Sequence, residues 1–203
     1  AGCGEHIVFV DTFYPQLNAN FVDMDNDQTV FAVVCHMKDA GFARVGFVGS
    51  NSDVTNFRLR EGAFYRACDK LDIKVSKQDR IMVAATRDGA YAQAKSYFEG
   101  QDSIADAYFC VNDIVAFGMM RALQELDYAI PADVSVYGYD NLPMSGLLSP
   151  SLSTVDVPKQ QIGAMAVRLL DDMIINGNSQ PSMKVLVTGR LILRKSTRKV
   201  LAK

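Results

Sequence analysis

The stretch YFCVNDIVAFGMMRALQELDYAIPADVSVYGYDNLP, from Tyr108 to Pro143, decides the fold of this chain. It is predicted to form a strand, a helix, a loop and a second strand. The first strand ends on Asn112-Asp113 and the second on Asp140-Asn141. In an open parallel sheet, ligands bind at the carboxyl ends of the strands. The stretch therefore predicts a site for a small polar ligand, which is either a substrate or a signal.

The composition excludes two classes of protein. The chain has 203 residues, of which 49% are hydrophobic, so it can bury the core of one large or two small domains. Its formal net charge of −2 argues against the chain binding nucleic acid by itself, because phosphate binding needs a basic surface. No run approaches the ~18 apolar residues of a membrane span. We therefore expect no membrane partner.

No pattern in the sequence indicates a metal, a cofactor or a catalytic pair. The cysteines Cys3, Cys35, Cys68 and Cys110 lie far apart, and each is in or beside an apolar run. Reduced buried thiols are favoured over disulfides or metal ligation. There is no His-and-carboxylate cluster, G-x-S-x-G, P-loop or G-x-G-x-x-G. The sequence therefore favours a binding protein over an enzyme.

Apolar runs alternate with helix-length segments, which is typical of an α/β fold built from βαβ units. Strands are expected at His6–Val10, Arg44–Val48, Arg80–Ala84, Ala105–Val111 and Val134–Tyr139. Helices with an apolar period near 3.6 are expected at Asn26–Ala40, Phe57–Leu71, Gly89–Glu99 and Asp113–Leu126. After Pro150 the expected elements are strand Leu152–Val155, helix Lys159–Ile175, and strands Met183–Val187 and Arg190–Leu193. The chain opens without an initiator Met and is expected to be a fragment.

Polar residues follow every strand of the repeating part, and the topology places them on one rim. They are Asp11–Tyr14, Ser50–Asp53, Ala85–Arg87, Asn112-Asp113 and Asp140-Asn141, with Arg58 and Arg60 at the start of a helix. Asp, Asn and Arg side chains in one cleft can exchange hydrogen bonds with a polyol, and a guanidinium can bridge two hydroxyls or a carboxylate.

Each of these residues also has a purely structural explanation. Asn112-Asp113 is suited to capping a helix, and Asp140-Asn141 to an ordinary turn. Arg58 and Glu61 are spaced for a surface ion pair, so Arg60 is the arginine expected to contact a ligand. Taken together on one rim, the residues favour a ligand site.

The helix Asp113–Leu126 is more apolar than one sheet face requires. Its apolar residues are Ile114, Val115, Phe117, Met119, Met120, Leu123 and Leu126. Burial under neighbouring loops would explain this. We prefer a subunit interface, to which Leu147-Leu148 would add apolar surface.

Eight stretches, in order, resemble the effector-binding domain of the lactose-repressor (LacI/GalR) family of bacterial transcription regulators. They are IVFVD (Ile7–Asp11), VDMDN (Val22–Asn26), KDAGFARVGFVG (Lys38–Gly49), FRLREGAFYRA (Phe57–Ala67), VNDIVAFGMMRAL (Val111–Leu123), IPADVSVYGYDN (Ile130–Asn141), SPSLSTVDVP (Ser149–Pro158) and GRLILRKST (Gly189–Thr197). The resemblance covers essentially the whole chain.

The resemblance implies two Rossmann-like lobes of the periplasmic-binding-protein-like type, with parallel sheets flanked by helices and an effector in the cleft. Residues 25–154 plus 188–203 would form the C-terminal lobe. Residues 1–24 plus 155–187 would form part of the N-terminal lobe. The family's helix-turn-helix and the first elements of its N-terminal lobe have no counterpart in this sequence, so that lobe is expected to be incomplete.

The resemblance also assigns residues. Arg60, Asn112 and Asp140 fall on effector-contacting positions, and Asp11 and Met24 on cleft positions. The stacking aromatic of sugar-responsive members is replaced by Ala85, for which Phe13, Tyr14 or Phe57 are possible substitutes. Phe117, Met120 and Leu148 match dimer-interface positions.

The implied function is that of a cytoplasmic, homodimeric regulator. A sugar or similar small polar metabolite would bind in the cleft, alter the dimer geometry and so change operator affinity. Operator DNA would be contacted only through the N-terminal domain absent from this chain. The alternative is an exported periplasmic-type sugar-binding protein, but the RKST tail and the apolar helix favour the regulator. No catalytic pair supports an enzyme.

Overall fold

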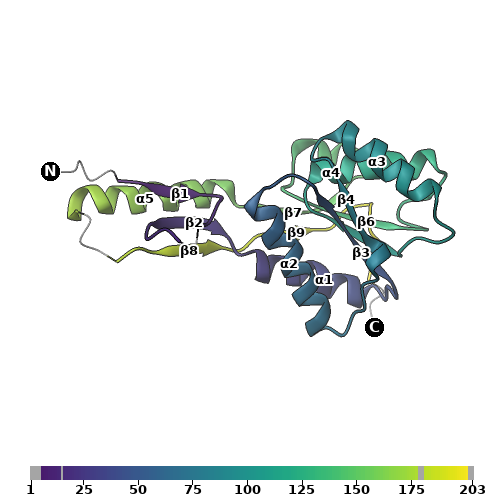
Figure 1. Cartoon of the computed structure of the whole chain (residues 1–203), viewed down its shortest axis with the longest axis horizontal. Coiled ribbons are helices and arrows are strands. Elements are labelled where there is room, and N and C mark those ends of the chain that lie inside the picture. The colour runs from purple at the N-terminus through teal and green to yellow at the C-terminus, as the bar shows by residue number, and fades with distance from the viewer. Residues whose placement is uncertain (1–5, 15, 178–180, 201–203) are drawn as a thin grey trace. The chain divides into compact units, whose positions relative to one another are not determined.

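A computed structural model describes residues 6–14, 16–177 and 181–200, which belong to two compact units (Figure 1). Unit 1 comprises residues 1–25 and 157–189, and unit 2 comprises residues 26–156 and 190–203. The chain therefore passes between the units three times. These junctions lie one, two and two residues further along the chain than those that the resemblance implies.

Unit 1 contains a small parallel sheet with one helix on it. The strand order is β1 (Val8–Val10), β2 (Asn20–Met24) and β8 (Lys184–Val187), and α5 (Lys159–Asn176) packs against β1 and β2. The sequence did not predict β2, because Asp23 interrupts its apolar run. Asp23 is nevertheless buried, and its Oδ1 accepts a hydrogen bond from the Met24 amide at 2.7 Å.

Unit 2 contains a six-stranded sheet between two pairs of helices. The strand order is β4 (Arg80–Val83), β3 (Val45–Ser50), β5 (Ala107–Cys110), β6 (Ser135–Tyr139), β7 (Ser153–Asp156) and β9 (Arg190–Ile192). All neighbours are parallel except β7 and β9, so the last strand departs from the expected parallel pattern.

The helices of unit 2 form a layer on each face of its sheet. Figure 1 shows α3 (Arg87–Glu99) beside α4 (Asp113–Glu125) on one face, and α1 (Asn26–Asp39) beside α2 (Thr55–Lys70) on the other. Short 3₁₀ turns at Lys77–Asp79 (η1) and Pro143–Gly146 (η2) complete the unit. Every predicted helix and strand is present in the two units, with ends that differ by at most two residues.

Aromatic side chains form a continuous path through the core of unit 2. Phe47 lies 5.4 Å from Phe64, Phe64 lies 6.0 Å from Phe109, and Phe109 lies 6.4 Å from Tyr139, measured between ring centroids. All four side chains are buried in the core or at its edge. Such pairs stabilise a core beyond the area that they bury. The path ends at Tyr139, at the carboxyl end of β6.

The described parts of the chain contain no helix long and apolar enough to cross a membrane, and no cluster of three or more His, Cys, Asp or Glu suited to a metal. Cys35, Cys68 and Cys110 are free thiols, whereas Cys3 lies outside the described residues. Burial raises the pKa of the Cys68 thiol to about 12. A thiol with so high a pKa is unreactive at neutral pH.

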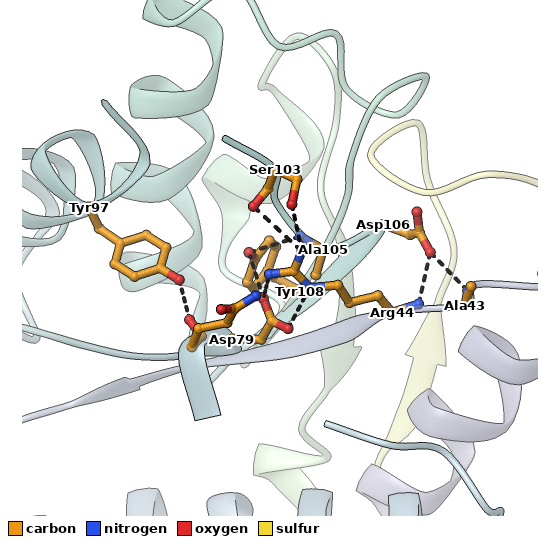
Figure 2. A network of polar contacts seen from close by, with 9 residues as sticks. Ala43, Arg44, Asp79, Tyr97, Ser103, Ala105, Asp106 and Tyr108 are labelled. Atoms are coloured by element: carbon orange, nitrogen blue, oxygen red, sulfur yellow. Dashed lines mark hydrogen bonds and ion pairs between the residues drawn. The ribbon is translucent and has the colours of Figure 1, made fainter. Parts of the chain in front are cut away.

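A buried polar network ties the amino ends of β3, β4 and β5 together (Figure 2). Arg44 donates from Nε and Nη2 to the two carboxylate oxygens of Asp79, both at 2.7 Å. The Tyr108 hydroxyl lies 3.5 Å from the same carboxylate and accepts a hydrogen bond from the Ala105 amide at 3.1 Å. Asp79 is fully buried, whereas the Arg44 side chain is 26% exposed. A bidentate guanidinium–carboxylate pair of this kind fixes geometry as well as charge.

We expect Asp79→Ala to lower the free energy of unfolding by about 2–3 kcal/mol, because it leaves Arg44 and Tyr108 without their buried acceptor. Urea unfolding followed by circular dichroism measures the loss. Asp27→Ala is the matched control, because the Asp27–Arg66 pair is exposed on both sides and should contribute little. Equal losses in the two variants would show that the Asp79 network adds no stability.

Candidate functional site

The topology of unit 2 places a switch point between β3 and β5. These two strands are neighbours, yet the chain leaves β3 through α2 towards β4 and leaves β5 through α4 towards β6, on the opposite side. Ligands of open α/β sheets bind at such a switch point, outside the carboxyl ends of the strands. Arg60 connects α2 to the end of β5, because its Nη1 donates a hydrogen bond to the carbonyl oxygen of Val111, just beyond β5, at 3.0 Å.

Arg60 is a buried cation whose Nε has no hydrogen-bond partner. The distance from Arg60 Nη1 to Asp140 Oδ1 is 3.5 Å. The guanidinium carbon of Arg60 lies 3.8 Å from the centre of the Tyr139 ring. Only 4% of Arg60 is exposed, and its buried Nε has no hydrogen-bond partner. Burial of a polar group without a partner is costly and rare in native structures. The Asp140 carboxylate, whose side chain is 27% exposed, is the part of this pair that solvent reaches.

Asn112 is the residue that caps α4. Its Oδ1 accepts a hydrogen bond from the Val115 amide at 2.9 Å, and its backbone is extended, as a cap requires. The capping explanation is thus correct for Asn112. The cap uses the side-chain oxygen, so a ligand would meet the amide nitrogen of this residue. Capping and ligand contact are compatible roles for Asn112.

Asp113 fixes the loop after β6 to the start of α4 through hydrogen bonds. Its fully buried carboxylate accepts hydrogen bonds from the Leu142 amide at 2.8 Å, the Ser145 hydroxyl at 2.5 Å and the Thr154 hydroxyl at 2.5 Å. Burial raises the pKa of Asp113, and these hydrogen bonds act in the opposite direction. The carboxylate also lies directly over Gly138, where a Cβ would collide with it. Asp113 joins the start of α4 to β6, β7 and the loop between them.

The end of β6 is a sharp turn with unusual backbone angles. Asp140 has φ 107° and Asn141 has φ 46°, both in the region that favours glycine. The turn explanation of Asp140-Asn141 is therefore correct. The same turn places the Asp140 carboxylate beside Arg60. Turn and ligand contact are again compatible.

The other charged residues of the rim pair differently from the prediction. Arg58 pairs with Asp53, and Glu61 accepts from Arg80 at 2.5 Å, so the expected Arg58–Glu61 pair is wrong. Both pairs line a separate cavity of about 340 Å³ together with Phe57. Phe57 lines this cavity, and Arg60 does not.

The remaining predicted site residues belong to unit 1. Asp11 follows β1 with φ 57°, and its amide donates to the Val22 carbonyl at 3.1 Å. Met24 is buried at the end of β2. The Lys184 ammonium lies 3.5 Å from the ring centre of Phe13, so one face of this ring is already covered. Arg60, Asn112 and Asp140 are thus the predicted residues that unit 2 gathers by itself.

The apolar residues of α4 have partners inside unit 2. Phe117 is 9% exposed and Met120 is 3% exposed, and α4 packs closely along α3. A Cβ at Gly118 would lie 2.5 Å from the Arg87 carbonyl oxygen, which shows how near the two helices are. Burial within the chain therefore accounts for the excess of apolar residues. Leu147, in contrast, is 80% exposed beside the part-exposed Leu148.

Tyr139 and Arg194 belong to the site and were not predicted. Tyr139 stacks on Arg60, and its hydroxyl donates to Asn26 Oδ1 at 3.2 Å. Its position next to Asp140 is the only signal that the sequence offers. Arg194, two residues beyond β9, donates to Asn141 Oδ1 at 2.7 Å, and no local pattern indicates this contact between residues far apart in the chain.

Residues 34–197 match the sequence profile of the periplasmic binding protein-like domain. The chain belongs to this family. Curated proteins similar to the chain are helix-turn-helix-type transcriptional regulators. The regulator MalR of Streptomyces coelicolor is 31% identical, and the match covers 96% of this chain and 56% of MalR. The repressor PurR of Haemophilus influenzae is 25% identical, with 92% of this chain and 56% of PurR covered. This LacI-family chain thus spans about half the length of these curated relatives.

Solved LacI-family structures share the fold. A regulator from Arthrobacter sp. FB24 in complex with lactose has a TM-score of 0.80 at 25% identity, covering 94% of this chain and 71% of that one. A regulator from Bacillus cereus subsp. cytotoxis has a TM-score of 0.84 at 24% identity, covering 94% and 67%. The second likeness shows the fold alone. Together they confirm a periplasmic-binding-protein-like fold with part of the larger domain present in this LacI-family chain.

The Asp113 hub makes a direct prediction for this LacI-family domain. Asp113→Ala should lower the free energy of unfolding by about 3 kcal/mol, because one part-buried and two buried donors lose their acceptor. Asp113→Asn is the matched control: its amide can donate to Thr154 Oγ1 while its oxygen still accepts from Leu142 and Ser145. Urea unfolding should show less than half the loss for the asparagine variant. Similar losses for both would mean that packing, and not hydrogen bonding, holds this corner.

Proposed function

We propose that this chain senses a small polar metabolite, a sugar or sugar derivative, as the effector-binding part of a cytoplasmic LacI-family transcriptional regulator. The observation that carries the proposal is the pair of the buried Arg60 and the partly exposed Asp140 at the switch point of the sheet. Residues 26–156 and 190–203 would be the C-terminal lobe of the family fold, and residues 1–25 and 157–189 part of the N-terminal lobe.

The proposed ligand class follows from the groups available. Arg60 offers an N–H donor, Asp140 a charged acceptor and Asn112 an amide donor. Neighbouring hydroxyls of a sugar ring can donate to the carboxylate and accept from the other two groups. The 25% identical Arthrobacter regulator, solved with lactose, supports a sugar. The contributions of Asp11 and Met24 rest on the family resemblance alone.

Regulation would follow from differential binding. An effector that binds one conformation of the protein more tightly shifts the population towards it. If that conformation has a different operator affinity, effector and operator influence each other's binding reciprocally. The relatives are helix-turn-helix regulators, so we assign operator contact to a region outside this chain.

We also propose that the regulator is a homodimer whose interface includes Leu147 and Leu148, which follow η2, whereas the predicted interface residues Phe117 and Met120 are buried within unit 2. Exposed apolar side chains support this surface, since Met144 is 50% exposed and Leu147 is 80% exposed on the η2 loop next to Leu148. Exposed apolar patches of this kind often mark interfaces between proteins.

A thermal-shift screen of sugars, sugar phosphates and nucleobases on the full-length protein identifies the effector. Arg60→Ala and Asp140→Ala should then each weaken its binding by about 1–3 kcal/mol in calorimetry, as for a lost charged hydrogen bond. Arg58→Ala is the control, because Arg58 is an exposed arginine on the same helix, paired with exposed Asp53. Unchanged affinity in both site variants, with the fold intact by circular dichroism, would refute the site.

The interface prediction uses Leu147, because substitution of the buried Met120 would disturb the fold itself. Leu147→Glu should move the sedimentation profile of the protein towards monomer, since it places a charge in an apolar interface. Val167→Glu, an exposed apolar residue on α5 of unit 1, is the control. An unaltered sedimentation profile for Leu147→Glu would exclude the η2 loop from the interface.

A further inference from the structure

The turn after β6 holds two consecutive residues with positive φ, neither of which is glycine. Asp140 has φ 107° and Asn141 has φ 46°. Strained backbone of this kind persists only where the surroundings fix it, and it gathers at ligand sites and switches. The question is which contacts fix this turn.

The side chain of Asn141 connects the end of β7 to the segment that follows β9. Its Nδ2 donates to Asp156 Oδ1 at 2.8 Å, and its Oδ1 accepts from Arg194 Nη2 at 2.7 Å. Arg194 is itself fixed by a second bond from Nη1 to the Leu152 carbonyl at 2.7 Å. The backbone adds a bond from the Asp140 amide to the Val155 carbonyl at 3.0 Å.

Asparagine suits this position for three physical reasons. It adopts positive φ more readily than most residues. Its amide nitrogen satisfies the Asp156 carboxylate, and its oxygen satisfies the Arg194 guanidinium. Aspartate would set two carboxylates against each other, and glycine would remove both bonds while keeping the backbone free to turn.

The two partners of Asn141 lie on segments that lead to and from unit 1. Asp156 is the last residue of unit 2 before the chain crosses, and β9 begins at Arg190, the first residue after it returns. Asp140, which lies beside Arg60, therefore precedes Asn141, whose side chain donates to Asp156 at the point where the chain leaves unit 2.

We propose that Asn141 is a positioning residue, which holds Asp140 against Arg60 and links this pair to junction strand β7 and to Arg194, two residues beyond β9. The proposal rests on the proposed function only where it treats Asp140 as a ligand contact. Ligand contact at Asp140 would then change the hydrogen bonding of β7 and Arg194 through Asn141. The hydrogen bonds of Asn141 to Asp156 and Arg194 do not depend on which ligand binds.

The first experiment compares hydrogen–deuterium exchange of the 203-residue chain and its Asn141→Gly variant. Asn141→Gly should speed exchange of the Asp140–Leu142 amides and of β7 at least tenfold, with α3 as an internal reference. Asp127→Gly is the matched control, because Asp127 also has positive φ but is exposed, and only its backbone amide is bonded, to Gln124. Unchanged protection in Asn141→Gly overturns the proposal.

A rescue variant separates the specific bridge from general packing. Asn141→Asp should speed exchange in the same segment at neutral pH, because its carboxylate faces Asp156. Adding Asp156→Asn reverses donor and acceptor in this pair and should restore protection to within about twofold of the wild type. Failure of the double variant to recover, when the single variant is affected, would show that the Asn141–Asp156 bond is not the cause.

The ligand arm uses lactose, cellobiose and ribose as probes. For a sugar that raises the thermal stability of the wild type, Asn141→Gly should weaken apparent affinity at least fivefold, and Asp127→Gly should not. Equal affinities would overturn the link from Asn141 to ligand contact. If none of the three sugars stabilises the wild type, the sugar proposal loses its support, while exchange and rescue still decide the role of Asn141.

Discussion

The corner of unit 2 at which β5, β6 and β7 end depends on one buried carboxylate. Asp113 accepts hydrogen bonds from Leu142, Ser145 and Thr154. These donors come from the loop after β6 and from β7, so a single side chain fixes the start of α4 relative to both. Asn112 precedes this carboxylate, and Asp140 precedes the loop that it holds. The polar groups of the candidate site therefore inherit their positions from a residue that is itself inaccessible.

The repeating secondary structure was predictable because its signals are local. Apolar runs and a 3.6-residue period depend only on neighbouring residues, and they located the helices and all strands except β2. That strand was missed because Asp23 is polar yet buried, with its carboxylate bonded to the next backbone amide. Their positions after the predicted strands indicated Arg60, Asn112 and Asp140 as parts of a polar rim. The family resemblance then assigned these three residues to effector-contacting positions.

Contacts between distant residues could not be predicted in the same way. Arg58 and Glu61 have the correct helical spacing, but each has a better placed partner, Asp53 and Arg80. The excess of apolar side chains on α4 led to a preference for a subunit interface, but Phe117 and Met120 are buried within unit 2. A periodic pattern measures how much surface a helix must cover, and only the tertiary structure identifies what covers it.

The close approach of Gly138 to Asp113 has a consequence for how this corner can evolve. A Cβ at position 138 would collide with the Asp113 carboxylate, so a larger residue there requires a smaller or reoriented side chain at 113. Replacement at 113 would in turn release the donors of Ser145 and Thr154. Substitutions at these positions should therefore be tolerated as sets, and single exchanges removed by selection.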